Sequence, residues 1–458
     1  MKAPLPAASV LILALLGTVS ASMLRDEASE PGVGFFGPAS AYDVPDPTTA
    51  SSCKARRARV AAELGDGVLI ISAGENIEGR YHADALFFWL TGVNVPDAVL
   101  AIRAEDGVIT TERLYLPPKD LDFERWNGPR LAPDEFTLQT TGIASVGELE
   151  KWEDDLLELL PQTSPAPKGP SGDVLDEQLE TLRKPPAKSS PYIAGDDIKE
   201  AIKKIGRKHR SATNFLRALA AVRDESELAA IGAAIDMTQQ ALAEAFAVVR
   251  PGAWEFEAEA AIESGYRKRG AFGPSFPSIV GSGPNSCYLH YRSNTRQFQA
   301  GDIVVMDVGA RYMNYCADVT RTIPVSGTFT PRQLEVYTAV WDASVAGAAT
   351  LRPGASIRDA HNAAKAVLAE RDLDQYFLHG VGHGLGLFVH DTPGFRGELA
   401  PGMVVTIEPG VYIAEEELGV RIENDWLITE EGAVCLSNEL PGAPDELLAF
   451  LNKARGGP

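Results

Sequence analysis

Three of the chain's seven histidines lie close together, in the run His379-Gly380-Val381-Gly382-His383-Gly384-Leu385-Gly386-Leu387-Phe388-Val389-His390-Asp391. Histidine is the usual imidazole ligand of transition metals and the usual proton carrier near neutral pH. The four glycines in the run allow close backbone approach and positive φ, so we expect neither a regular helix nor a regular strand throughout. Taken alone, the run is also compatible with a glycine-rich loop that carries incidental histidines.

Two aspartates upstream lie in neighbouring apolar runs, Asp307 after Ile303-Val304-Val305-Met306 and Asp318 before Val319. We expect a hairpin with its turn at 311–314. Pairing Ala310 with Tyr315 then places Asp307 directly opposite Asp318, with Cβ atoms about 5 Å apart. Two carboxylates on one face repel each other unless a cation lies between them. The alternative, a surface hairpin with solvated acids, does not explain the apolar neighbours of Asp307.

The same pattern, one acid in an apolar run, recurs downstream at Glu408 and Glu423. Together with His383 and the two aspartates, they form a candidate set of four carboxylates and one imidazole. Such a set suits Mn²⁺ and tolerates Co²⁺ or Zn²⁺. Four carboxylates carry too much charge for one dication, so we expect two divalent metal ions about 3.5–4 Å apart. A pair of this kind acidifies a water molecule and polarises a carbonyl, which predicts a hydrolase.

In their order and context, these five residues resemble the ligand set of the metallopeptidases with the pita-bread fold, peptidase family M24. The family contains methionine aminopeptidases, prolidases and aminopeptidases P, and the resemblance extends from about Arg56 to Glu446. The stretches 84–92 and 124–131 look like the N-terminal domain of aminopeptidase P. The resemblance therefore implies a Xaa-Pro aminopeptidase, whose substrate is a peptide with proline at the second position.

The resemblance also implies a role for each site residue. Asp307 would chelate one metal ion, His383 and Glu408 the other, and Asp318 and Glu423 would bridge them. A hydroxide bridging the ions would attack the scissile carbonyl, and Glu408 would handle its proton. Four further residues match the family's active site: His290 and His390, which would stabilise the tetrahedral intermediate or position the substrate, and His379 and Arg421, which would line the region around the proline.

Three alternatives stay open at this point. A prolidase cleaves only Xaa-Pro dipeptides with the same metals. A non-catalytic pita-bread binding module is a second alternative, although such members commonly lose metal ligands and all five candidates stand here. A creatine amidinohydrolase-like enzyme shares the two-domain layout but works without the dinuclear site.

The elements that must position these residues indicate an α/β (α+β) chain of two domains. We expect an N-terminal creatinase/prolidase-like α/β domain at 53–160, a linker or insertion rich in Pro, Ser and Lys at 161–200, a pita-bread catalytic domain at 201–450 and a tail at 451–458. The tetrapeptide Arg-Pro-Gly-Ala ends two expected long helices, at 250–253 and at 352–355, and a second helix follows each copy. Matched context of this kind predicts an internal duplication, and hence a pseudo-two-fold domain with its site between the halves.

The N-terminus and the overall charge restrict location and partners. The apolar run 7–19, followed by Ser20-Ala21-Ser22, predicts a cleavable signal peptide at 1–21 and a mobile tail at 22–52, hence export to the periplasm or medium. The alternative start at Met23 predicts a cytoplasmic protein. The net charge of −21 argues against nucleic acid as a partner. We expect no stable membrane anchor and a homo-oligomer, either a dimer or a tetramer.

Overall fold

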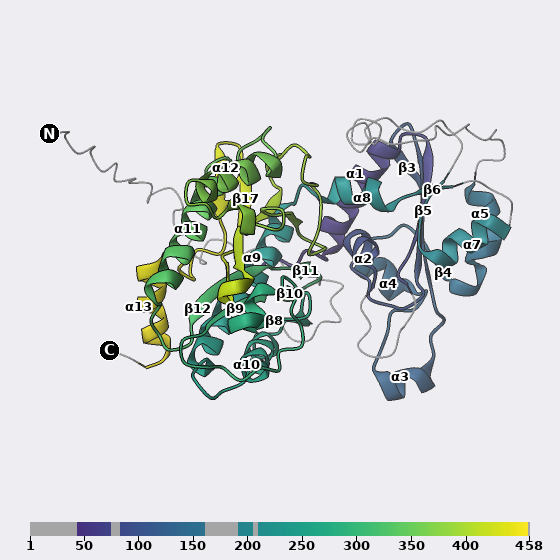
Figure 1. The fold of residues 1–458 in the computed structure, drawn as a ribbon. Coiled ribbons are helices and arrows are strands. Elements are labelled where there is room, and N and C mark those ends of the chain that lie inside the picture. Colours follow the sequence, from purple (N-terminus) through teal and green to yellow (C-terminus); the bar gives the residue numbers. More distant parts are fainter. Residues whose placement is uncertain (1–43, 75–82, 161–190, 205–208, 457–458) are drawn as a thin grey trace, which may run out of the picture. The chain divides into compact units, whose positions relative to one another are not determined.

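The computed structural model describes residues 44–74, 83–160, 191–204 and 209–456; the predicted signal peptide and most of the predicted tail and insertion lie outside these residues. The first half of the described chain forms a mixed six-stranded sheet in the order β4-β3-β2-β1-β5-β6 (Figure 1). Its strands are β1 (Gly67–Ser72), β2 (Val99–Glu105), β3 (Val108–Leu116), β4 (Val146–Glu148), β5 (Tyr192–Ala194) and β6 (Arg210–Ser211). The apolar central strands β1 and β2 pair antiparallel, whereas β1 and β5 pair parallel. Strands alternate with helices along this half, which confirms the predicted α/β domain.

Short helices accompany this sheet, and side-chain caps fix where several of them begin. The Asp84 carboxylate accepts hydrogen bonds from the backbone of Leu86 and Phe87 and so starts α2, whose seven residues are all buried. Gly92, in the left-handed conformation, ends that helix. The helices of this half are α1 (Ala50–Leu64), α2 (Ala85–Thr91), α3 (Leu121–Asn127), α4 (Glu135–Thr141), α5 (Trp152–Leu159), α7 (Asp196–Lys204) and α8 (Thr213–Ala220), with a 3₁₀ turn η1 (Leu149–Lys151).

Three predicted boundaries are corrected by these elements. Helix α1 begins at Ala50, inside the predicted tail, because Thr49 caps it. Strand β5 lies inside the predicted linker and helix α7 begins there, since Ile193 of β5 and Ile198 and Ile202 of α7 belong to one buried apolar cluster although polar residues surround them in sequence. Strand β6, which falls in the predicted catalytic domain at 201–450, is instead the edge strand of the N-terminal sheet. Helix α13 (Pro444–Ala454) continues into the predicted C-terminal tail, where Leu451 is buried.

The described residues after α8, which fall in the predicted catalytic domain and are named the catalytic half, contain two helix pairs that repeat one another. These are α9 (Glu225–Val248) with α10 (Glu255–Lys268), and α11 (Pro331–Ala348) with α12 (Ile357–Ala369). After the first helix of each pair, glycine takes a positive φ, 89° at Gly252 and 80° at Gly354. Each glycine N–H donates to a distant carbonyl at 2.9 Å, that of Phe298 or that of Leu399. The repeated tetrapeptide thus makes equivalent hydrogen bonds in both halves, which supports the predicted duplication.

Strands in small sheets lie among these helices and carry the site. Figure 1 shows β8, β9, β12 and β17 flanked by α10, α11 and α13. The sheets are ordered β12-β9-β8, β13-β14-β17-β18, β11-β10-β7 and β15-β16. The strands are β7 (Gly273–Pro274), β8 (Ile279–Ser282), β9 (Ile303–Val308), β10 (Ala310–Tyr312), β11 (Tyr315–Cys316), β12 (Val319–Pro324), β13 (Gly384–Leu385), β14 (Val404–Ile407), β15 (Gly410–Ile413), β16 (Leu418–Arg421), β17 (Asn424–Thr429) and β18 (Gly432–Cys435), with 3₁₀ turns η2 (Gly283–Cys287), η3 (Asp374–Tyr376) and η4 (Ala414–Glu416).

The hairpin between the two aspartates differs in register from our prediction. Tyr312 pairs with Tyr315, so the turn contains only Met313 and Asn314, with φ of 47° and 66°. Asp307 consequently lies opposite Thr320 and not opposite Asp318. The predicted longer turn was wrong because two residues with positive φ close a hairpin with a two-residue loop. The shift is an even number of residues, and since side chains alternate with period two, it preserves the face on which both aspartates point.

Candidate active site

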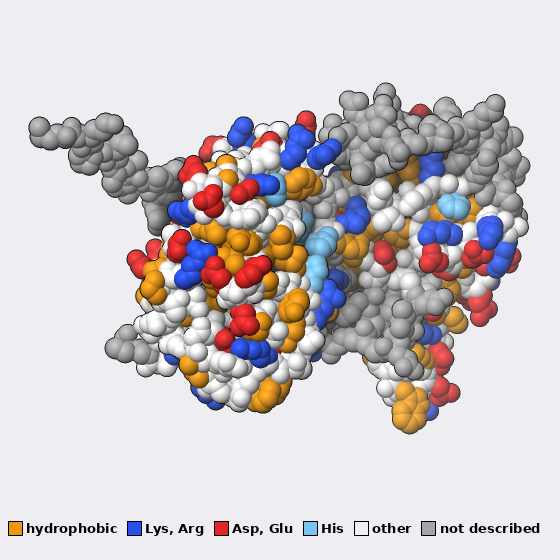
Figure 2. Space-filling view, viewed as in Figure 1, with side chains coloured by type: hydrophobic (Ala, Val, Ile, Leu, Met, Phe, Trp, Pro, Cys, Tyr) orange, Lys and Arg blue, Asp and Glu red, His pale blue; other side chains and the backbone are white. Residues whose placement is uncertain are grey.

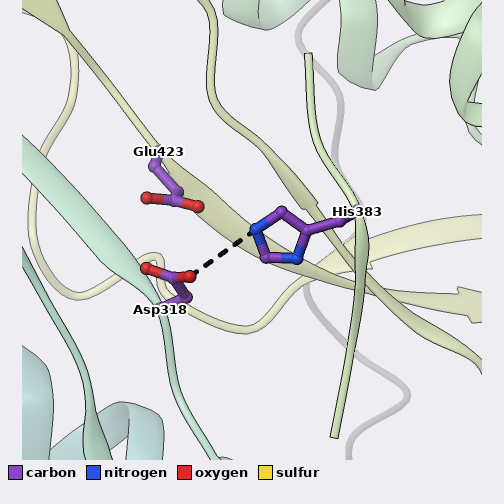
Figure 3. Close-up of side chains that lie close together, drawn as sticks. All are labelled: Asp318, His383 and Glu423. Carbon is purple, nitrogen blue, oxygen red and sulfur yellow. Dashed lines mark ion pairs between the residues drawn. The ribbon is translucent and has the colours of Figure 1, made fainter. Parts of the chain in front are cut away.

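Asp318, His383 and Glu423 come together from three separate segments (Figure 3). Each offers a ligand atom, and these atoms lie within 4.8 Å of one another. The His383 Nε2 is 3.6 Å from Asp318 Oδ2 and 3.4 Å from Glu408 Oε1. Three of the predicted carboxylate ligands, Asp318, Glu408 and Glu423, are therefore gathered near the His383 imidazole.

The fifth, Asp307, lies on β9 and is held by Arg421, whose Nη2 donates to Asp307 Oδ2 at 2.7 Å. Its other carboxylate oxygen is buried and accepts no hydrogen bond from any described residue; the same is true of Asp318 Oδ1 and Glu423 Oε1. Buried carboxylate oxygens without donors are costly. They are free to bind a cation.

Charge within the cluster points the same way. Burial, followed by repulsion from Glu423 and Asp307, raises the pKa of Asp318 well above its ordinary value. Burial and repulsion from Glu408 do the same to the pKa of Glu423. Burial and neighbouring His390 lower the pKa of His383 to about 4, so its imidazole is neutral near pH 7. Repelling carboxylates beside a neutral imidazole fit divalent metal ions of hard or borderline character.

Backbone and side-chain contacts orient these candidate ligands. His383 Nδ1 lies 3.1 Å from the Gly384 carbonyl, a hydrogen bond that places the proton on Nδ1 and leaves Nε2 free to bind a metal. The Thr320 hydroxyl donates to Glu423 Oε2 at 2.7 Å. Thr320, the residue that the corrected register places opposite Asp307, therefore fixes a neighbouring carboxylate.

Glu408 is placed beside His383 by the backbone. Its N–H donates to the Val381 carbonyl at 2.6 Å, and the Thr406 N–H donates to the His383 carbonyl at 2.9 Å. Burial, opposed by Arg421 and reinforced by Asp307, raises the pKa of Glu408 to about 8. A carboxyl group with such a pKa can exchange a proton near neutral pH.

Tyr412 joins two predicted site residues and was itself missed. Its hydroxyl lies 2.9 Å from His379 Nε2 and accepts a hydrogen bond from Arg421 Nη1 at 2.7 Å. In the β15–β16 pair, Gly410 lies opposite Arg421, and Tyr412 is two positions further along the same strand. Strand alternation around Arg421 could have revealed this residue, because positions two apart share a face.

His390 and His290 are both exposed, and Figure 2 shows histidine side chains grouped on the surface. The ring centroids of His383 and His390 are 4.4 Å apart. The chain turns back between them, since the Asp391 N–H donates to the Gly384 carbonyl at 2.7 Å. The run is therefore neither a regular helix nor a regular strand throughout, as its glycines led us to expect. The Leu289 carbonyl, directly before His290, accepts a hydrogen bond from Arg421 at 3.4 Å. The backbone next to His290 therefore contacts the arginine that also holds Asp307.

Comparisons with known proteins agree with this arrangement. A family model described as "Metallopeptidase family M24" matches residues 229–430, and one described as "Aminopeptidase P, N-terminal domain" matches residues 53–166. The chain is 30% identical over 434 residues to the Xaa-Pro aminopeptidase of Escherichia coli, covering 85% of this chain and 95% of the relative. It is 31% identical over 479 residues to Xaa-Pro aminopeptidase 1 of Streptomyces coelicolor, covering 94% and 93%.

Solved structures are similar over the same extent. A zinc-substituted E. coli aminopeptidase P in complex with product superposes with a TM-score of 0.74 at 27% identity, covering 89% of this chain and 99% of that chain. Pseudomonas aeruginosa aminopeptidase PepP gives a TM-score of 0.75 at 26% identity with the same coverage. The chain therefore belongs to metallopeptidase family M24 and carries the aminopeptidase P N-terminal domain ahead of its catalytic domain.

Proposed function

We propose that this chain is a Xaa-Pro aminopeptidase, which hydrolyses the bond between an N-terminal residue and a following proline. The observation that carries the proposal is the approach of Asp318, His383 and Glu423, whose ligand atoms lie within 4.8 Å of one another. Glu408 lies 3.4 Å from His383, and Asp307 is held by Arg421. Similarity to Xaa-Pro aminopeptidases over nearly the whole chain supports this substrate class. It does not favour the prolidase alternative.

Asp307, Asp318, His383, Glu408 and Glu423 are the residues that would hold two divalent ions. When bound, such ions acidify an attacking water and polarise the scissile carbonyl. Glu408, whose Oε1 lies 3.4 Å from His383 Nε2, would take the water's proton.

Other residues in the site act on the substrate. His390 and His290 donate hydrogen bonds to the carbonyl oxygen as negative charge develops on it. The contacts from His379 through Tyr412 and Arg421 to Asp307 keep one side of the site rigid, where the proline is expected to lie.

We propose Mn²⁺ as the metal that the protein carries in the cell. Four carboxylates and a single imidazole form an oxygen-rich set, which Mn²⁺ prefers and in which Co²⁺ or Zn²⁺ can substitute. Elemental analysis of protein purified from its native host without added metal tests this choice. Zinc or cobalt as the dominant metal would refute it.

Product analysis of a peptide series tests the proposed activity. Tripeptides and longer peptides with proline at the second position should release the first residue, whereas the same peptides with alanine second should be hydrolysed far more slowly. Cleavage of Xaa-Pro dipeptides alone would identify a prolidase. Metal-loaded protein that cleaves none of these peptides would contradict both assignments.

We further propose export and self-association. None of the described helices combines the length and apolar character needed to span a bilayer. The signal-like segment lies before the described residues, so export rests on its sequence, and intact Met1 on protein from the native cytoplasm would refute it. Sedimentation analysis should find a dimer or tetramer; a monomer at micromolar concentration would contradict self-association.

A further inference from the structure

Asp391, the residue after His390, is buried and forms ion pairs with two arginines. Its Oδ2 accepts a hydrogen bond from Arg223 Nη2 at 2.7 Å, and its Oδ1 lies 3.3 Å from Arg217 Nε. The exposed fractions are 1% for the Asp391 side chain, 0% for Arg223 and 28% for Arg217. Both arginines lie outside the two family models: the model of the N-terminal domain ends at residue 166, and the M24 model begins at residue 229.

Arg217 contacts the segment around His390 in three ways. Its Nε faces Asp391, its Nη2 donates to the backbone carbonyl of His390, and its Cζ lies 4.6 Å from the ring centroid of Phe388. A planar guanidinium can make these contacts together, whereas a point charge cannot. Arg217 thus restrains the backbone on both sides of the exposed His390 imidazole.

Arg223 supports the same segment from inside the protein. A Cβ atom added at Gly386 would lie 1.9 Å from Arg223 Nη2, so glycine is required where the guanidinium crosses the loop. Behind it, Glu227 lies 3.8 Å from Arg223 Nη1 and accepts hydrogen bonds at 3.0 Å from Trp89 Nε1 and the Tyr315 hydroxyl. Since Trp89 belongs to α2, these contacts connect Arg223 to the N-terminal half of the molecule.

Arg217 itself lies on helix α8, which belongs to the N-terminal half. Helix α8 directly follows β6, the last strand of the N-terminal sheet. The Ala212 N–H donates to the Ile193 carbonyl at 2.8 Å, and the Phe215 ring stacks on Tyr192 with centroids 4.8 Å apart. Contacts with β5 of the N-terminal sheet therefore fix the position of α8 and of Arg217.

We propose that Arg217 is a positioning residue for peptide hydrolysis, by which the N-terminal half holds the Phe388–Asp391 segment and keeps the His390 imidazole beside His383. The inference rests on the proposed function, in which His390 acts on the scissile carbonyl. It assigns to the N-terminal half a direct part in ordering the catalytic site.

Arg217→Met tests the proposal, because it keeps the apolar stem and removes the guanidinium. We expect kcat to fall about 10- to 100-fold, since a small misplacement of a catalytic group has effects of this size. KM, bound metal and the thermal midpoint should stay near their wild-type values. Arg217→Lys should restore only part of the rate. Arg113→Met is the control: Arg113 is 37% exposed, close to the 28% of Arg217, and pairs with Asp155 at 2.6 Å, remote from His390 in sequence. This variant should leave kcat unchanged.

A double-mutant cycle with His390→Ala shows whether Arg217 acts through His390. We expect Arg217→Met to change kcat less than 2-fold in the His390→Ala background, because the group being positioned is already gone. Equal losses with and without His390 would overturn the proposal, and so would wild-type kcat in Arg217→Met.

A readout that does not depend on activity separates this inference from the proposed function. The spectra are recorded on Zn²⁺-loaded protein labelled at the histidine ring carbons, because paramagnetic Mn²⁺ would broaden signals beside the metal site. The His390 signal, identified by its loss in His390→Ala, should be sharp in wild type. It should broaden or split in Arg217→Met. An unchanged His390 signal in Arg217→Met would overturn the positioning role, whether or not the protein is active. A wild-type protein that cleaves no Xaa-Pro peptide would refute only the proposed function.

Discussion

The carboxylates around His383 are placed where they repel one another. Asp318 and Glu423 are buried and neither is paired with a described lysine or arginine, while Asp307 has one oxygen on Arg421 and one without a donor. Such an arrangement opposes folding unless cations bind to the folded state and not to the unfolded chain. If these residues hold the proposed ions, metal binding is therefore coupled to stability.

Replacing one bridging candidate tests this coupling. Asp318→Asn should lower bound metal and reduce the hydrolysis rate by at least about 100-fold, because loss of metal-activated water costs several kcal/mol. In the presence of chelator, however, the variant should melt at a higher temperature than wild type, since one repelling charge is gone. Metal analysis and thermal unfolding check both outcomes.

Asp196→Asn serves as the control, because its side chain is 94% exposed and, among the described residues, forms an ion pair only with Lys199. Its metal content, rate and melting temperature should match those of wild type. Full activity and full metal content in Asp318→Asn would contradict its assignment as a ligand.

His390 should act on the transition state. Removing a donor that stabilises an oxyanion typically costs about 100- to 1,000-fold in kcat. His390→Ala should therefore lose kcat by that factor while KM, fold and bound metal change little, as steady-state kinetics and metal analysis will measure. Loss of metal would instead make His390 a ligand, and a nearly unchanged kcat would leave it without a catalytic role.

At the scale of elements, the loop from His379 to Asp391 is built on close backbone contacts. Gly382 packs against β14 so tightly that an added Cβ would lie 2.0 Å from the Thr406 carbonyl oxygen. The backbone hydrogen bond from Thr406 to His383 runs beside this contact. The glycines among the histidines therefore allow the loop to pair with β14, which brings His383 next to Glu408.

Gly382→Ala should disturb this pairing. We expect a loss of about 1–3 kcal/mol in the free energy of unfolding, typical of overpacking, together with a lower metal content. Gly394→Ala is the control, because nothing lies within 4 Å of an added Cβ there. Denaturant unfolding of both variants checks the prediction. Equal stability of the two variants would mean that the close approach at Gly382 has no energetic importance.

How far the sequence predicts these elements depends on the range of the interactions. The candidate ligands that the structure brings together could be predicted because each acid interrupts an apolar run, a pattern that local sequence displays. The register of Asp307 against Thr320 could not, because it depends on two positive-φ residues at Met313 and Asn314. Arg217 was also beyond reach: it meets Asp391 across 174 positions of the chain, and no local pattern marks such a contact.

At the scale of the whole molecule, a buried arginine joins the N-terminal and catalytic halves. Arg56 of α1 donates to the Asp224 carboxylate at 2.8 Å and to the Pro47 and Trp89 carbonyls. Asp224 also caps α9. Burial alone would raise the pKa of Asp224, but Arg56 and hydrogen bonds from Ser226 and the Glu227 backbone outweigh burial and lower this pKa to about 2.

The ionised form of Asp224 should stabilise the molecule in a pH-dependent way. Asp224→Asn should cost about 1 kcal/mol at neutral pH, a modest value because the carboxylate is 39% exposed and partly screened. Since the folded pKa lies below the ordinary 3.8, wild type keeps its full advantage above about pH 4 and loses it as the pH falls toward 2. Thermal unfolding at pH 7 and pH 3 measures the difference. Equal stability at pH 7, or an advantage that grows in acid, would contradict the role of this pair.

The metal dependence of hydrolysis tests the central claim most directly, namely that five side chains hold two divalent ions required for the reaction. Protein stripped by chelator is reloaded stepwise with Mn²⁺, and bound manganese and the hydrolysis rate of a tripeptide with proline second are measured on the same samples. We predict no hydrolysis without metal and a rate that reaches its plateau only at two ions per chain. Full hydrolysis by the metal-free chain, or a plateau at one ion per chain, would contradict the two-metal centre.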